Sequence, residues 1–297
     1  MTDSSISTIL AVVNNRDDGE IVLDKAFTLA QHARASLHVV HVVHSAYAEL
    51  PVHTIETSQE LKTFILQAEE SVVEELLEPL MNRGVSIESA TIWHKREYEG
   101  ILDVAHDCGA DLIIKATEFP VTEVIRTPTD WNLLRHSDVP VMLVKPINWV
   151  ETPVIMAALN MTVDQGEDAL NDRILTRTKD LATALNGKIH VVTTYPSVEQ
   201  WVGPLTVIVD FDAVRRSVSK NVTNRVNEVL HKLGIAGATI HALEGDPATV
   251  IQQIVAETGA EVLVMGTHHR SGAKGIVLGN TSEKILHHVK SDVEVLH

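Results

Sequence analysis

Short runs of consecutive apolar residues alternate along the chain with longer segments in which apolar residues recur every three or four positions. Runs such as residues 9–13 and 112–114 are continuously apolar, which is typical of strands covered on both faces of a parallel sheet. Segment 61–77 has the three- and four-residue spacing of an amphipathic helix. Their alternation predicts βαβ units, and hence an α/β fold.

The same pattern occurs twice in the chain. The matched runs are 9–14 with 155–160, 37–40 with 189–192, 111–114 with 261–264, and 141–145 with 293–297. Because the offset drifts only from 146 to 152 positions, the pattern predicts a tandem duplication with small loop changes. We therefore expect two Rossmann-like domains, 1–148 and 149–297, each a five-stranded parallel sheet flanked by helices.

Composition narrows the functional classes. The 297 residues carry a net charge of −16, which disfavours nucleic acid and anionic membranes as partners. The single cysteine, Cys108, rules out an internal disulfide and fits a reducing compartment. The polar first residues lack a signal-peptide pattern, and no apolar run reaches the ~20 residues that span a bilayer. We expect a cytoplasmic protein.

A glycine-rich segment of the second half carries the candidate chemistry. It follows the apolar run 261–265, begins at Gly266 and ends at Gly279, and a helical pattern follows it. Glycines allow positive φ and close backbone approach, and Asn280, Thr281 and Ser282 are suited to capping the next helix. The first N–H groups of that helix would face an anion held by the loop. A glycine-rich surface turn is the alternative; the segment is no P-loop, because it lacks Gly-Lys-Ser/Thr.

This segment resembles the ATP-binding motif of the universal stress protein family, in which Gly, two residues, Gly, nine residues and Gly-Ser or Gly-Thr follow one another. Gly266 and Gly279 have the spacing of the first and third glycines, and Asn280 stands where Ser or Thr is usual. His269 occupies the second glycine position, where an imidazole would strain the backbone or block the site.

The resemblance extends to three other loops. Asn160 stands at the adenine-contacting aspartate, Thr194 at a hydrophobic position late in the second strand, and Gly245 in the loop near ribose. The implied ligand is ATP with Mg²⁺. The implied nucleotide-binding residues are Asn160, Thr194, Gly245, Gly266, His269, Gly279, Asn280, Thr281 and Ser282.

The first half departs from the motif. Ala116 replaces the first glycine, and Thr127-Pro128 replaces the last Gly-Asn, so one backbone donor is lost. We expect this half not to hold ATP in the family manner. The run from Thr127 to Trp131, with Trp93-His94 upstream, resembles the tandem-domain universal stress protein E subgroup, which implies a bacterial stress-response protein.

Three functions stay open. The first is a non-catalytic stress protein, a monomer or weak dimer, that binds ATP only in its second domain. Its domains would pair as a pseudo-dimer through 141–144 and 293–296.

The second is an interaction module, or a carrier of an apolar small ligand under lids at 46–55 and 195–209, with a vestigial nucleotide site. The third is a weak nucleotide hydrolase using Asp164 or Asp246. We expect no metal site at His268-His269 with His241, and no catalytic role for Cys108.

Overall fold

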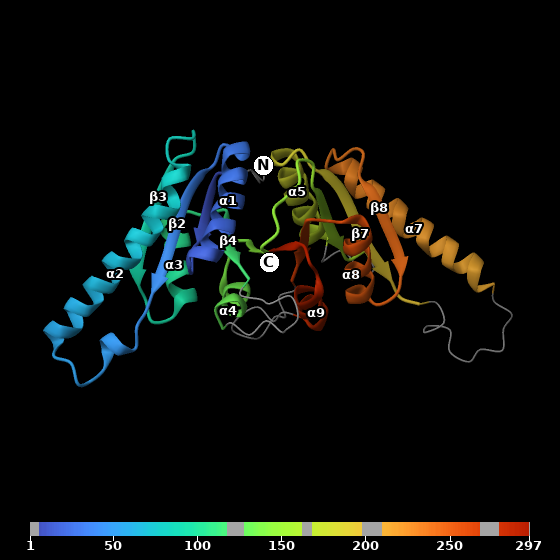
Figure 1. Cartoon of the computed structure of the whole chain (residues 1–297). Coiled ribbons are helices and arrows are strands. Elements are labelled where there is room, and N and C mark those ends of the chain that lie inside the picture. The colour runs from blue at the N-terminus through green and yellow to red at the C-terminus, as the bar shows by residue number, and fades with distance from the viewer. Residues whose placement is uncertain (1–5, 118–127, 162–167, 198–209, 268–278, 297) are drawn as a thin grey trace. The chain divides into compact units, whose positions relative to one another are not determined.

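The computed structural model describes residues 6–117, 128–161, 168–197, 210–267 and 279–296. The chain divides into two compact units (Figure 1). The described part of the first unit ends at Asn148, and the second unit begins at Trp149.

The first unit alternates strands and helices. Its elements are β1 (Thr8–Val12), α1 (Arg16–Ala33), β2 (Ser36–Val43), η1 (Tyr47–Glu49), α2 (Ile55–Leu77), η2 (Glu78–Leu80), β3 (Ile87–Trp93), α3 (Glu97–Cys108), β4 (Leu112–Ala116), α4 (Pro128–His136) and β5 (Val141–Val144). The strands run in the order β3-β2-β1-β4-β5, and every neighbouring pair is parallel.

The second unit repeats this arrangement. Its elements are β6 (Val154–Leu159), α5 (Asp168–Ala184), β7 (Lys188–Tyr195), α7 (Phe211–Lys232), β8 (Thr239–Glu244), α8 (Pro247–Thr258), β9 (Val262–Gly266), α9 (Asn280–His288) and β10 (Asp292–Leu296). The order β10-β9-β6-β7-β8 is also parallel throughout and matches the first unit strand for strand. The predicted fold class, two tandem Rossmann-like α/β repeats, is confirmed.

The core of each unit lies on both faces of its sheet. β4 is buried along its whole length, and α1 packs on β1 and β4 as α5 packs on β6 and β9. The first helices carry matching buried cations. Lys25 Nζ donates to the backbone oxygen of Lys145 at 2.9 Å, whereas Arg177 forms an ion pair with the buried carboxylate of Glu294. The two units therefore have a buried cation at the same helix position, but its partner is a backbone oxygen in the first unit and a carboxylate in the second.

A buried ion pair holds the first turn of α4 against the sheet. Lys115 Nζ on β4 lies 3.0 Å from Asp130 Oδ1, and both side chains are fully buried. At the corresponding positions the second unit has Met265 and Ser282. The pair joins the first turn of α4 to a buried strand of the sheet, so Asp130 has a structural role in addition to belonging to a run that carries the resemblance.

Candidate functional site

The candidate residues of the second unit lie along the carboxyl ends of three adjacent strands. β6 pairs with both β7 and β9, which places Asn160 between the ends of these strands. Thr194 is the next-to-last residue of β7, and Gly266 is the last of β9. This is the edge at which open parallel sheets bind ligands. His269 lies outside the described residues, as does the side chain of Asn280.

Gly266 lies against the side chain of Leu170. A β-carbon built there would stand 2.6 Å from Leu170 Cδ2 and 2.9 Å from Leu170 Cγ, much closer than atoms pack. The buried positions of α1 and α5 correspond at a constant offset, which matches Leu170 with Asp18. Asp18 is held by the N-cap Asn15, and the first unit accommodates the side chain of Ala116 in place of a glycine. The first glycine of the motif therefore brings α5 close to β9.

The backbone of Asn160 is fixed by a neighbouring amide. Its N–H donates to Asn171 Oδ1 at 3.2 Å, and Asn171 Nδ2 donates to its carbonyl oxygen at 2.8 Å. Asn171 is buried, so this clamp defines how the chain leaves β6. Beside it, Arg225 on α7 donates from Nη1 to the Met161 oxygen at 2.6 Å, which brings a cation to this strand end. The sequence did not predict Arg225, because its position depends on how α7 docks.

The loop after β8 is tightly held. Gly245 has φ of +138°, a conformation that side chains rarely adopt, and its N–H donates to the Tyr195 oxygen at 3.0 Å. Asp246 then caps α8, because its carboxylate accepts from Thr249 N at 3.1 Å. Hydrogen bonds from Thr249 hold the pKa of Asp246 below its usual value. The carboxylate of Asp246 therefore acts as a helix cap, and its low pKa makes it a poor proton acceptor.

Gly279, the third glycine of the motif, is the N-cap of α9. Its φ of −75° and ψ of 157° are open to any residue, and no atom of the described residues lies within 4 Å of a β-carbon built there. The expectation that the side chains of residues 280–282 cap this helix is wrong: α9 starts at Asn280, and its cap makes no side-chain hydrogen bond. Thr281 is exposed and Ser282 is buried. Among the side chains that the structure describes, none caps the first N–H groups of α9.

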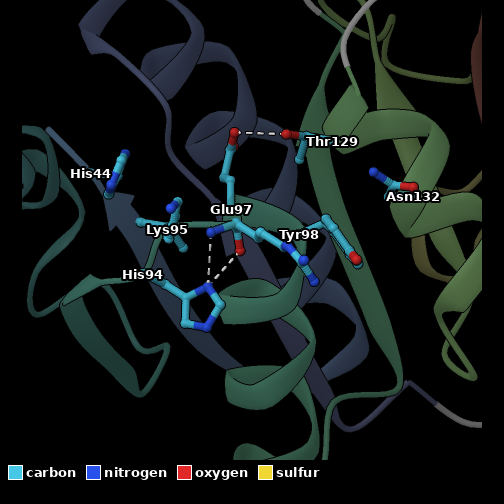
Figure 2. A pocket seen from close by; sticks show the side chains of 9 residues that line it. His44, His94, Lys95, Glu97, Tyr98, Thr129 and Asn132 are labelled. Atoms are coloured by element: carbon cyan, nitrogen blue, oxygen red, sulfur yellow. Dashed lines mark hydrogen bonds between the residues drawn. The ribbon is translucent and has the colours of Figure 1, made fainter. Parts of the chain in front are cut away.

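The first unit has a pocket of about 600 Å³ at the carboxyl ends of β2 and β3, which Figure 2 shows from close by. Its lining residues are Val42, His44, His94, Lys95, Arg96, Glu97, Tyr98, Thr129 and Asn132. His94 Nδ1 lies 2.6 Å from the Arg96 carbonyl oxygen, and Thr129 Oγ1 donates to Glu97 Oε2 at 2.9 Å. The sequence analysis did not predict this pocket, although the polar run 94–96 directly after β3 is a signal for it.

Glu49 closes a polar network beside this pocket. Its carboxylate accepts from His44 Nε2 and Trp93 Nε1, each at 3.2 Å, and pairs with Lys62 Nζ at 3.2 Å. Hydrogen bonds from His44, Lys62 and Trp93 lower the pKa of Glu49 from its usual 4.5 to about 2. The network joins η1 to the end of β3. By contrast, Tyr47, Val52 and Ile55 in the proposed lid 46–55 are exposed, so this segment presents apolar side chains to solvent.

The described part of the chain holds no group of three or more His, Cys, Asp and Glu side chains placed to bind a metal. His190 Nδ1 and His241 Nε2 lie 3.1 Å apart, and burial lowers the pKa of both rings. Cys108 is half-buried on α3, and burial raises the pKa of its thiol, which makes it a weaker nucleophile. Among the described residues, no helix combines the length and apolar character required to cross a membrane.

Universal stress proteins are among the known proteins that are similar to this chain. The sequence profile of the Universal stress protein family matches residues 5–145 and 161–297. Universal stress protein E homolog of Haemophilus influenzae is 27% identical over 292 residues, covering 94% of this chain and 93% of its own length. Universal stress protein E of Escherichia coli K12 is 26% identical over 298 residues, covering 97% and 93%.

Solved structures show the same fold over the whole chain. A putative universal stress protein from Pseudomonas aeruginosa UCBPP-PA14 superposes with a TM-score of 0.75 at 23% identity, covering 99% of this chain and 94% of its own. A universal stress protein from Archaeoglobus fulgidus gives a TM-score of 0.67 at 16% identity, covering 97% and 95%.

Proposed function

Because the chain belongs to the universal stress protein family and is of its tandem-domain type, we propose that it is a non-catalytic cytoplasmic stress-response protein of bacteria that binds ATP with Mg²⁺ in its second unit. The observation that carries the proposal is the uncapped start of α9 at Gly279. It belongs to the same unit in which Asn160, Thr194 and Gly266 lie at the carboxyl ends of three adjacent strands.

The helix start supports a phosphate-binding role. Asp or Ser at an N-cap usually accepts a hydrogen bond from a first-turn N–H, and Gly279 cannot. Those donors and the helix dipole favour an anion. Arg225, whose guanidinium reaches the backbone just after Asn160, adds positive charge at the same edge of the sheet. In this proposal, Asn160 and Thr194 lie on the adenine side and Gly279 lies on the phosphate side.

The first unit has features that disfavour the same ligand. Its α4 begins at Pro128, which has no N–H to donate. Asp130, which matches Ser282, is committed to a buried ion pair with Lys115. The proposal therefore assigns ATP to the second unit alone.

The states of the Asp246 carboxylate and the Cys108 thiol support a non-catalytic role. Asp246 caps α8 and has a lowered pKa, so it is a poor general base. Cys108 has a raised pKa and lies on α3 of the other unit. Asp164, the other candidate base, lies outside the described residues.

The test is isothermal titration of MgATP into the full chain, followed by an assay for phosphate release. The proposal predicts saturable binding at one site and no release above that of a heat-inactivated control. Turnover that disappears in Asp246→Ala would instead establish a hydrolase. An absence of binding would favour the interaction module, which the exposed side chains of Tyr47, Val52, Ile55 and Phe64 support.

A further inference from the structure

We propose that the first unit has a second, independent ligand site for a small phosphorylated polyol such as a sugar phosphate. The site is the pocket between the carboxyl ends of β2 and β3 and the first turns of α3 and α4 (Figure 2). Its volume of about 600 Å³ lies within the range of small-molecule sites. This site goes beyond the proposed function, because none of its residues belongs to the second unit.

One side of the pocket is cationic. His94, Lys95 and Arg96 follow one another directly after β3. Lys95 is exposed and forms no ion pair with any residue that the structure describes. The Nδ1 atom of His94 is engaged by the Arg96 backbone, which fixes the ring and leaves Nε2 for a ligand. Arg96 pairs with Glu99 at a surface-exposed contact, which a phosphate can share at little cost.

The opposite side selects hydroxyl groups. Figure 2 shows Glu97 reaching toward Thr129, to which it is hydrogen-bonded at 2.9 Å, with Tyr98 and Asn132 on the same side of the pocket. The carboxylate of Glu97 repels a second phosphate but accepts hydrogen bonds from hydroxyls. The amide of Asn132 offers both a donor and an acceptor. One anionic end and one polyhydroxylated end therefore fit the pocket better than a triphosphate does.

The two units differ in charge at the matching helix start. Arg96 is the N-cap of α3, and its side chain makes no capping hydrogen bond. Asp246 is the N-cap of α8, and its carboxylate accepts from Thr249 N. The residue directly after the preceding strand also differs: it is His94 after β3 in the first unit and Gly245 after β8 in the second. At this pair of matching helix starts, the first unit has a cationic side chain and no side-chain cap, whereas the second unit has a carboxylate that caps the helix.

The test is titration of the full chain with ribose 5-phosphate, inorganic phosphate and ribose. We expect saturable binding of ribose 5-phosphate at one site, with inorganic phosphate weaker and ribose weaker still. Lys95→Gln should weaken binding by about tenfold, the loss expected for one charge-assisted hydrogen bond. The matched control, Lys220→Gln, removes an exposed lysine on α7 and should leave the affinity unchanged.

Arg96→Asp separates binding from folding. The variant has aspartate at the start of α3, as the second unit has Asp246 at the start of α8. The new carboxylate should cap α3, so the melting temperature should stay the same or rise while binding is abolished. Gly279→Asp, in the second unit, should leave ribose 5-phosphate binding intact. The proposal is overturned if ribose 5-phosphate does not bind, if inorganic phosphate binds as tightly, if Arg96→Asp binds like the natural chain, or if Gly279→Asp abolishes binding.

Discussion

Gly266 and Leu170 are in such close contact that a methyl group at position 266 would force the Leu170 side chain to shift. A β-carbon at position 266 would lie 2.6 Å from Leu170 Cδ2. In the first unit, Ala116 and Asp18 occupy the matching positions. The change from glycine to alanine between the repeats is therefore linked to a change on the facing helix. The replacement of this glycine by Ala116 in the first unit is a difference in helix–strand packing. It would affect a bound ligand only through the position of the helix.

Gly266→Ala should destabilise the second unit by about 1–3 kcal/mol, the usual cost of overpacking. Leu170→Ala should relieve most of that cost, so the double variant should be more stable than the sum of the two single effects predicts. Urea denaturation of the four proteins measures this coupling. Additive effects would show that the contact with Leu170 is not what excludes a side chain at position 266.

Asp130→Asn should destabilise the first unit by about 3–5 kcal/mol, because it leaves Lys115 as a buried charge without its carboxylate. Lys115→Met with Asp130→Ser installs the residues of the second unit and should recover much of the loss. Thermal and urea denaturation measure both variants. If the double variant were less stable than Asp130→Asn, the two units would not be interchangeable at this position.

Glu49 should contribute to the pH dependence of stability. Its pKa is about 2 in the folded protein, below its usual 4.5. As the pH falls through this window, the unfolded chain takes up the proton first, so the contribution is complete above about pH 4.5 and is lost toward pH 2. Glu49→Gln should flatten the stability curve in this range. NMR titration of the Glu49 carboxyl checks the pKa directly, and an ordinary midpoint would contradict the network with His44 and Trp93.

His269→Gly should strengthen MgATP binding if the second unit is a nucleotide site, because it restores the second glycine of the motif. The change in affinity is measured by titration calorimetry, with His288→Gln on the exposed end of α9 as a histidine control. Binding that remains undetectable after His269→Gly would mark the motif as vestigial.

The fold could be predicted because buried parallel strands leave continuous apolar runs, and the duplication makes the same runs occur twice in the chain. The start of α9 was not predicted correctly, since Asn280 and Gly279 are equally plausible caps until the backbone is seen. The Lys115–Asp130 pair could not be predicted, because the position of a lysine inside an apolar run does not indicate which carboxylate it pairs with. The pocket was not predicted because its lining comes from the end of β2, the β3–α3 connection and α4, which only the fold brings together. That residues 141–144 and 293–296 join the two units stays a prediction.

The measurement that most directly tests the central claim compares MgATP binding to Gly279→Asp and Gly279→Asn. Both residues fit, because no atom of the described residues lies within 4 Å of a β-carbon at position 279, and both can cap α9 and raise the melting temperature. They differ only in the negative charge at the helix start. The account predicts that the Asp variant loses binding while the Asn variant retains measurable binding. Equal binding by the two variants, or none by the unaltered protein, would contradict it.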